Sequence, residues 1–384
     1  MADENSNNGE QVFPEVSPKP RKVFRVPKGY AIPDSASTFV RDVGMEQQFL
    51  DLFRLHGFAI TRGGIFNQNN PNEFGEGNNS DISQRDTDRK ISEKAGVKMP
   101  EIHSPQEVIE SDKRFVAKIP DAQRGESKFL LETKEQKLKF LAWSLLANNI
   151  SKLFIDGKLI DAKLKDIFAK VERGDFSDDL FDVKALNRWI FEDYIETPGL
   201  FNTSLRVVVD GLGTIHYSQV ARSDNPKDTY SSPVSQSLPT DIVALWGKDL
   251  AIFLEHPDSP FYIRPKSFVS NIARGGKPII LDGSPVEEDT SKKVLEDLGI
   301  DPSNPQMPMI LQPIASKIGR LSRGNYPFVG IDFLKSKDTG ELILLEVNAG
   351  PHLRPEGLGL PDSTSDTDCD LELLRRILNS PILT

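Results

Sequence analysis

Apolar and polar positions alternate along the chain in short runs that predict both helices and strands. Helical spacing predicts helices at 86–95, 291–298 and 308–321, and Gly96 and Gly299 follow the first two. A glycine commonly ends a helix because it adopts the left-handed backbone conformation without a steric penalty. Apolar runs predict strands in three neighbouring pairs, which are 114–120 with 129–132, 189–196 with 204–211, and 328–334 with 342–348. Because short polar connections favour antiparallel pairing, the pattern predicts an α/β (α+β) protein dominated by antiparallel hairpins.

The composition limits the classes of protein to which the chain can belong. It has 384 residues, enough for two or three subdomains, and 47 Lys+Arg against 57 Asp+Glu give a net charge of −10. Binding to nucleic acid without sequence preference needs a basic surface, so we expect no nucleic-acid partner. A local basic pocket for a nucleotide phosphate is compatible with the acidic net charge. The hydrophobic share of 38% suits a chain with a buried core. Residues 1–25, rich in Asn, Pro and charge, are expected to form a disordered tail.

The sequence argues against disulfides, against cysteine or histidine metal sites, and against a membrane or secreted location. The one cysteine, Cys369, excludes an internal disulfide framework and a cysteine-based zinc site. The five histidines are far apart and form no His-x-x-x-His pair, which argues against a histidine metal site. No run of 18 apolar residues occurs, and the acidic, polar N-terminus lacks a signal-peptide pattern. We therefore expect no membrane partner and a cytoplasmic location.

The segment 330–351, GIDFLKSKDTGELILLEVNAGP, carries the most specific chemistry. Glu346 and Asn348 are two positions apart, which places both side chains on the same face of one strand. Asp332 lies on the preceding strand and reaches that face if the two strands pair across their turn. Two carboxylates and an amide oxygen form a hard-oxygen site suited to Mg²⁺, which also binds nucleotide phosphates. The alternative is that Glu346 pairs with an arginine or lysine of the scaffold.

A second candidate site surrounds Lys118 in the predicted strand RFVAKIP. A lysine among inward-pointing apolar residues is costly unless it meets an anion. The following loop offers backbone N–H groups, a guanidinium and a hydroxyl at Gln123, Arg124, Gly125 and Ser127, which suit a phosphate. The alternative is a lysine whose charged end reaches solvent at the end of a strand. Neither a Walker A motif nor GxGxxG occurs in the chain.

Further positive charge comes from Arg206, Arg222 and Arg274, with Asn271 near the last of them. Each of these side chains alone is most simply a surface group. Beside a carboxylate metal site, they would stabilise a phosphate that moves between oxygens.

Taken in order, these segments resemble the ATP-grasp superfamily of carboxylate–amine ligases, from about Asp86 to Pro351. The magnesium-ligand motif with Asp332, Glu346 and Asn348 is the specific part of this resemblance. FVAKIPDAQRGESKFLL is similar to the family's strand with a phosphate-contacting lysine, followed by its flexible phosphate loop. SFVSNIARGGKP is similar to the family's N-x-x-x-GG segment, and DRKISEKAGVKMPE to its helix before the first nucleotide-binding strand.

The hinge of the family is matched by IFEDYIE. The resemblance implies that the backbone of Glu192, Asp193 and Tyr194 meets adenine and that Glu196 binds ribose. The first nucleotide-contacting lysine of the family would be Lys90, with Arg89 as the other candidate.

The catalytic residues implied by the resemblance are Arg206, Arg222 and Asn271. The two arginines are expected near the γ-phosphate and the acyl phosphate. Lys118 and the loop from Gln123 to Lys128 would neutralise phosphate charge.

The resemblance also implies two α+β subdomains that hold the nucleotide between them. We expect a short N-terminal domain at 26–85, an N-terminal ATP-grasp subdomain at 86–200 with a helical insertion at 131–188, and a C-terminal subdomain at 201–384 with an insertion at 223–266. The short first domain and the single glycine of the phosphate loop depart from the family's pattern.

The activity implied is ATP-dependent joining of a carboxylate to an amine, or to a thiol, through an acyl phosphate with ATP and Mg²⁺. EVNAGP resembles the ribosomal-protein-S6-modifying and glutathione-synthetase-like branches, and residues 74–101 resemble the archaeal purine-biosynthesis formylating synthetase less strongly. Small-molecule or peptide carboxylates and amines are the expected substrates, and a homodimer is common in the family. The alternatives are a nucleotide-binding scaffold without turnover and a kinase of the same fold that acts on a non-carboxylate acceptor.

Overall fold

The computed structural model describes most of the chain after residue 83. The described residues are 84–119, 128–155, 158–159, 161–211, 213–227, 229, 257, 259–264, 270, 276–322, 328–348, 353–361, 363–364, 369, 372–373 and 376. The expected tail, the expected N-terminal domain and most of the expected insertion at 223–266 lie outside them.

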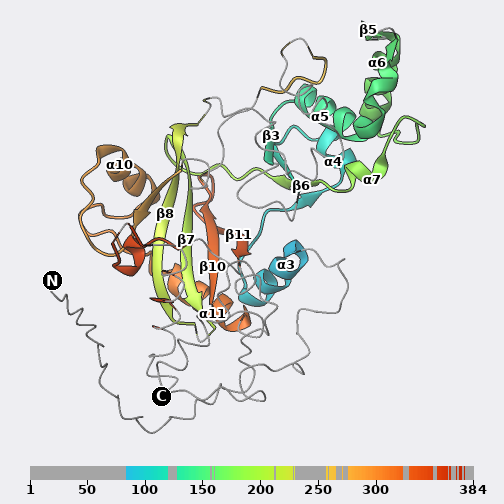
Figure 1. The fold of residues 1–384 in the computed structure, drawn as a ribbon. Coiled ribbons are helices and arrows are strands. Elements are labelled where there is room, and N and C mark those ends of the chain that lie inside the picture. The colour runs from blue at the N-terminus through green and yellow to red at the C-terminus, as the bar shows by residue number, and fades with distance from the viewer. Residues whose placement is uncertain are drawn as a thin grey trace, which may run out of the picture.

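Two antiparallel sheets form the framework (Figure 1). The first sheet has the order β1-β6-β2-β3, with β1 at Ile102–His103, β2 at Phe115–Lys118, β3 at Lys128–Leu131 and β6 at Ile190–Asp193. The second has the order β11-β10-β7-β8-β9, with β7 at Phe201–Asp210, β8 at Ile215–Pro226, β9 at Lys277–Ile280, β10 at Phe328–Lys335 and β11 at Leu342–Asn348. A small hairpin joins β4 (Phe154–Ile155) to β5 (Lys158–Leu159).

Helices cover one face of each sheet. The first sheet is accompanied by α4 (Pro105–Glu110), α5 (Lys134–Leu146), the 3₁₀ helix η1 (Ala147–Leu153), α6 (Asp161–Glu172) and α7 (Val183–Leu186). The second is accompanied by α3 (Gln84–Ala95), α10 (Asp289–Leu298), α11 (Leu311–Ser322) and the 3₁₀ helix η4 (Glu356–Leu358). In Figure 1, α5 and α6 lie on the side of the first sheet that is away from the second sheet.

The core of the first sheet is aromatic. Alternation along β2 turns Phe115 and Ala117 to the helix side, where both are fully buried. The rings of Phe129, Phe140 and Trp189 pack edge to face or tilted, with centroids 5.0–5.5 Å apart. This packing anchors α5 on the sheet and leaves the opposite face of β2 and β6 for polar side chains.

The core of the second sheet comes from the alternate apolar residues of β7 and β10 packed on α10 and α11. Gly319 lets α11 approach β7 closely, since a Cβ atom there would lie 2.5 Å from the carbonyl oxygen of Asp210. The helix α3 precedes the first sheet in the chain, yet its Ile91 packs in this second core. The backbone N–H of Leu344 donates to the carbonyl of Lys98 at 2.8 Å, which ties the segment after α3 to β11.

The sequence patterns predicted the fold class and two of the three strand pairs. The expected pair of 189–196 with 204–211 is wrong, because β6 pairs with β1 and β2 in the first sheet while β7 pairs with β8 and β10 in the second. The fold is an α+β fold built from antiparallel hairpins, and β11 occupies the expected residues 342–348. The expected helical insertion at 131–188 contains α5, α6 and α7, but also η1 and the β4–β5 hairpin. Within the described part of the chain, no helix has the length and apolar character needed to cross a bilayer.

Candidate functional site

Strand register brings the predicted metal ligands together on one face of the second sheet. Asp332 lies directly opposite Glu346 of β11, and Gly330 lies opposite Asn348. The register shifts after Asp332, so that Leu345 is an extra residue in β11. Asp332, Glu346 and Asn348 therefore share a face, as their spacing predicts.

Arg206 of β7 holds the carboxylate of Asp332 from the other side. The two residues are directly opposite in the β7–β10 register, and Nε and Nη2 of Arg206 donate to Oδ1 and Oδ2 of Asp332 at 2.7 and 2.6 Å. This two-point geometry is the strongest form of the arginine–carboxylate pair. The sequence placed Arg206 near a transferred phosphate, whereas the structure gives it Asp332 as a direct partner.

The acidic pair has opposite pKa shifts. Burial, with the neighbouring charge of Glu346 adding to it, raises the pKa of Asp332 above its usual value. Burial acts the same way on Glu346, but the charges of Lys128, Lys118 and Arg206 outweigh it and lower its pKa to about 2. Lysines of the first sheet therefore act electrostatically on a carboxylate of the second.

The donor set of this face fits a magnesium ion. Carboxylate and amide oxygens are the ligands that Mg²⁺ accepts in proteins. Two carboxylates directly opposite each other in a sheet repel, and a cation between them removes that cost. Asp332, Glu346 and Asn348 are the residues that would hold the ion.

The facing surface of the first sheet carries two lysines side by side, of which Lys118 is paired with a carboxylate. Lys118 of β2 lies directly opposite Lys128 of β3, and the charge of Lys128 adds to burial in lowering the pKa of Lys118. Lys118 is 7% exposed, and its Nζ pairs with Oε2 of Glu192 at 2.8 Å. Two lysines in cross-strand register repel each other, so an anion between them would stabilise the sheet.

Arg85 at the start of α3 completes this cation cluster. It is 5% exposed, pairs with Oε1 of Glu192 and donates to the carbonyl of Leu345. Within the described residues, Nε of Arg85 has no hydrogen-bond acceptor, whereas Nη2 is the atom that pairs with Glu192. A buried guanidinium N–H without an acceptor is costly, which points to an acceptor beyond the described residues.

Sequence reasoning missed Arg85. It began the helix at Asp86 and proposed Lys90 or Arg89 as the first nucleotide-contacting cation. Lys90 is exposed on α3, and Nη2 of Arg89 donates to the carbonyl of Pro100 at 3.0 Å. The helical spacing of Arg85 from the buried Asp88 and Ser92 places these three on one face and could have identified it.

A pocket of about 640 Å³, including its open mouth, separates the two polar faces. Its walls contain Lys118, Lys128 and Glu192 from the first sheet, and Leu334 and Leu345 from the second. The segment that links the sheets, including Tyr194, Ile195 and Thr197, lines its side. Ligands commonly bind at a junction between two structural units, which makes this pocket a candidate ligand site.

The predicted hinge residues have different positions and partners. Glu192 faces the pocket, whereas the side chain of Asp193 points to the opposite face of β6 and contacts His103. The N–H groups of Asp193 and Tyr194 donate to the carbonyls of Glu101 and Arg114, at 3.0 and 3.1 Å. These two N–H groups are therefore committed to the protein backbone.

Glu196, predicted to bind ribose, joins two charged side chains. Arg114 lies 2.5 Å from Oε2 of Glu196, and Lys337 of the β10–β11 turn lies 2.7 Å from Oε1. Glu196 thus connects the loop between α4 and β2 to the second sheet.

Arg222 does not join Arg206. Arg206 is opposite Gln219 in the β7–β8 register, and Arg222 is three residues further along, so it lies on the other face of the sheet. There Nη2 of Arg222 pairs with Oε1 of Glu288 at 3.0 Å, and its guanidinium lies over the ring of Phe201. The other predicted residues, Gln123, Arg124, Gly125, Ser127 and Asn271, lie outside the described residues.

Gln219 is a polar residue that the sequence gave no reason to select. It lies beside Arg206 on the face of Asp332 and is fully buried. Neither its Nε2 nor its Oε1 has a hydrogen-bond partner in the described structure. An amide left in this way costs about 1–3 kcal/mol unless a ligand or a water satisfies it.

Comparisons with known proteins give distant likenesses to solved structures. No family model matches the chain, and a search of curated proteins finds no match. Several of the solved structures that resemble it are described as ATP-grasp ligases. One is a RiPP-associated ATP-grasp ligase of Chryseobacterium gregarium in complex with ADP and a leader and core peptide, with 15% identity, covering 77% of this chain and 58% of that one, at a TM-score of 0.30.

Two others are the ATP-grasp ligase PsnB and a D-alanyl-alanine synthetase. PsnB, complexed with a phosphomimetic variant of its minimal precursor, Mg and ADP, has 12% identity and a TM-score of 0.37, covering 92% of this chain and 86% of that one. D-alanyl-alanine synthetase A of Vibrio cholerae has 9% identity and a TM-score of 0.33, covering 77% and 64%. The chain spans less than two thirds of the first and third of these proteins. Because the likenesses are distant, the proposals below rest on the contacts of this chain.

Proposed function

We propose that the chain is an ADP-forming, ATP-dependent ligase that joins a carboxylate to an amine through an acyl phosphate. The observation that carries the proposal is a pair of like charges in each of the two sheets that border one pocket. Lys118 and Lys128 lie opposite each other in the first sheet and line the pocket, and Asp332 and Glu346 lie opposite each other in the second sheet, on the face of the pocket-lining Leu334. A nucleotide phosphate with its magnesium ion compensates both pairs at once, because it brings negative charge to the lysines and positive charge to the carboxylates.

The residues of the chain have distinct parts in this reaction. Arg85, Lys118 and Lys128 bind and orient the phosphates of ATP. Arg206 keeps the carboxylate of Asp332 in position opposite Glu346. Magnesium held by Asp332, Glu346 and Asn348 would reduce the charge on the β- and γ-phosphates. Positioning and electrostatics of this kind are the main sources of rate in phosphoryl transfer, so no histidine or cysteine nucleophile is required.

The proposed chemistry has two steps. The substrate carboxylate attacks the γ-phosphorus of ATP, the bond to the β-phosphate oxygen breaks, and ADP leaves with an acyl phosphate formed. The amine then attacks the acyl carbon, inorganic phosphate leaves, and the amide retains the new C–N bond. Small molecules and peptides are both proposed as donors of the carboxylate and the amine.

One observation favours a second candidate, a nucleotide-binding scaffold without turnover. Both oxygens of Asp332 already accept hydrogen bonds from Arg206. A metal ion must therefore share the carboxylate of Asp332 with the guanidinium of Arg206. If Arg206 never releases that carboxylate, the chain would bind nucleotide without transferring phosphate.

Thermal unfolding with and without Mg·ATP, followed by an assay of ADP release, tests the proposal. Ligand at about 100 times its dissociation constant adds roughly 2.7 kcal/mol of stability. We expect a magnesium-dependent increase in Tm that Glu346→Gln reduces. Glu341→Gln, which removes an exposed partner of Lys98 on the same hairpin, is the control and keeps the increase.

The outcomes separate the candidate functions. ADP release that requires both a carboxylate and an amine supports the ligase. A ligand-induced increase in Tm without ADP release, over a panel of amino acids and short peptides, supports the scaffold. ADP release with a phosphorylated product and no amide identifies a kinase, and no increase in Tm for folded protein contradicts all three.

A further inference from the structure

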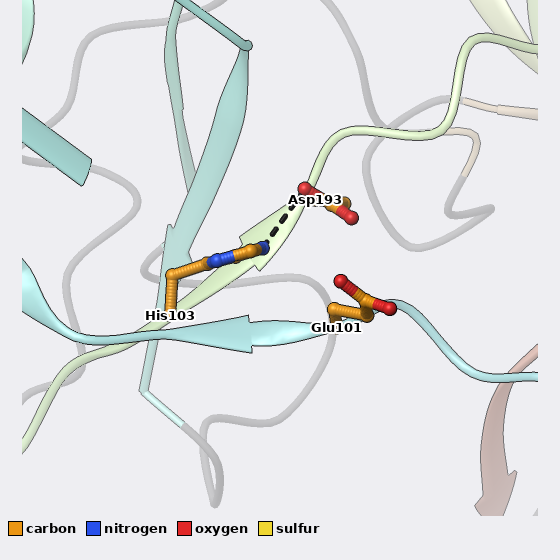
Figure 2. Close-up of side chains that lie close together, drawn as sticks. All are labelled: Glu101, His103 and Asp193. Carbon is orange, nitrogen blue, oxygen red and sulfur yellow. Dashed lines mark hydrogen bonds and ion pairs between the residues drawn. The ribbon is translucent and has the colours of Figure 1, made fainter. Parts of the chain in front are cut away.

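A second group of possible metal ligands lies on the face of the first sheet that is turned away from the pocket. Glu101, His103 and Asp193 each offer one ligand atom, and these three atoms lie within 4.8 Å of one another. Figure 2 shows the side chains converging from β1 and from the end of β6. Because neighbouring residues of a strand point to opposite faces, the carboxylate of Asp193 joins His103 while that of Glu192 faces the pocket, which Asp193 also borders at the end of β6.

Strand register explains why the three side chains meet. Ile102 is opposite Glu192 in the antiparallel β1–β6 pair, and the N–H of Asp193 donates to the carbonyl of Glu101 at 3.0 Å. Glu101 and Asp193 are therefore a cross-strand pair of like charge. Such pairs destabilise a sheet, so a cation held between them would stabilise this edge.

The histidine is already oriented toward the same point. Its Nε2 lies 2.9 Å from Oδ1 of Asp193, and its ring packs edge-on against Phe115 with centroids 5.0 Å apart. The side chains of His103 and Asp193 are only 15% and 21% exposed. A ring held by packing and a carboxylate shielded from solvent lose little freedom when they bind an ion.

We propose that Glu101, His103 and Asp193 bind a zinc ion at the edge of the first sheet. One imidazole nitrogen with two carboxylate oxygens is a donor set for Zn²⁺, whereas Mg²⁺ and Ca²⁺ prefer oxygen ligands alone. Three protein ligands leave a fourth tetrahedral position for water or for an external ligand. The ion takes the place of the hydrogen bond between Nε2 of His103 and Oδ1 of Asp193.

The ammonium group of Lys113 must move away from Asp193 before an ion binds there. Nζ of Lys113 lies 3.7 Å from Oδ1 of Asp193, but its side chain is 64% exposed and can turn to solvent. On α4, the carboxylate of Glu107 is held by Ser104, and its negative charge adds to the attraction for a cation.

Titration of the metal-free full chain with Zn²⁺ alone, followed by calorimetry, tests the proposal. We expect one ion per chain, with affinity reduced about tenfold or more in His103→Gln and Asp193→Asn. Glu101→Gln is the decisive variant, because Glu101 is exposed and its replacement leaves the sheet hydrogen bonds in place. Co²⁺ provides a spectroscopic check, since a four-coordinate site with one histidine gives visible absorption bands that the Glu101→Gln variant weakens.

Two controls keep the result specific. Glu110→Gln changes an exposed carboxylate at the end of α4 and should bind Zn²⁺ like the native chain. Glu346→Gln removes the carboxylate of the proposed magnesium site and should also leave Zn²⁺ binding unchanged. Unchanged Zn²⁺ affinity in folded His103→Gln and Glu101→Gln, or no binding by the native chain at micromolar Zn²⁺, would overturn the proposal.

Discussion

Arg85 of α3 reaches the carboxylate of Glu192 in β6, so a helix packed on the second sheet contributes positive charge to the first. The same guanidinium donates to the carbonyl of Leu345 in β11. One side chain thereby connects both walls of the pocket. This contact gives the pocket a third cation close to the opposed lysines Lys118 and Lys128.

Replacing Arg85 should weaken ATP binding more than any other change on α3. Arg85→Met removes a buried cation, and a hydrogen bond to a charged group contributes about 1.5–3 kcal/mol, or roughly 10- to 100-fold in affinity. Calorimetric titration with Mg·ATP measures the loss. Lys90→Met, an exposed position on the same helix, should bind ATP like the native chain. The assignment fails if the Lys90 variant loses affinity and the Arg85 variant does not.

Glu196 should make the free energy of unfolding depend on pH below about pH 5. Hydrogen bonds from Lys337 and Arg114 lower its pKa from 4.5 to about 2, against the opposing effect of burial. A carboxyl whose pKa is lower in the folded than in the unfolded chain stabilises the fold at any pH above the unfolded-state pKa. This stabilisation is lost as the pH falls from about 4.5 toward 2. Glu196→Gln should cost about 1–2 kcal/mol at pH 7 after allowance for solvent screening, and nothing extra at pH 2.

Urea unfolding of Glu196→Gln at pH 7 and at pH 3 checks this. Glu341→Gln, which loses an exposed pair with Lys98, should cost less than about 0.5 kcal/mol. Equal losses for the two variants would show that Glu196 contributes no more than an ordinary surface pair.

Removing Arg206 should destabilise the chain strongly. Arg206→Met leaves Asp332 buried without its partner, which costs about 3–5 kcal/mol. Arg206→Lys keeps the charge but not the two-point geometry and should cost less. Urea unfolding gives both values. Addition of Mg²⁺ should restore part of the stability of Arg206→Met, because the ion then compensates the Asp332–Glu346 pair.

The magnesium effect has its own control. In Arg206→Met combined with Glu346→Gln, the second carboxylate is absent and Mg²⁺ should restore little. Equal recovery in the single and double variants would show that Mg²⁺ acts elsewhere.

Replacing Gln219 should change the KM for a substrate rather than lower the free energy of unfolding. Gln219→Leu keeps the size of the side chain and removes an amide without partners, so the free energy of unfolding should stay the same or rise by about 1 kcal/mol. If the amide awaits a carboxylate or amine substrate, the KM for that substrate should increase while the affinity for ATP is unchanged. A variant with lower stability and an unchanged KM would assign Gln219 a structural role.

Local periodicity was sufficient to predict much of this protein. The α+β class, the pairs β2–β3 and β10–β11, and the ends of α3 and α10 at Gly96 and Gly299 follow from spacing and turn residues, since these depend on neighbours in the chain. The common face of Glu346 and Asn348 follows in the same way, because alternation along a strand is a local property. Lys118 was also recognisable, as a charge within an apolar run.

Only the tertiary structure decided which charges meet. The pairing of Asp332 with Arg206, the reach of Arg85 to Glu192, and the meeting of Glu101 and His103 with Asp193 all join residues distant in sequence. Strand register controls such contacts, and a shift of one residue turns every side chain to the other face. That is why Arg222, an equally plausible arginine in the sequence, lies on the helix-covered face while Arg206 lies in the site.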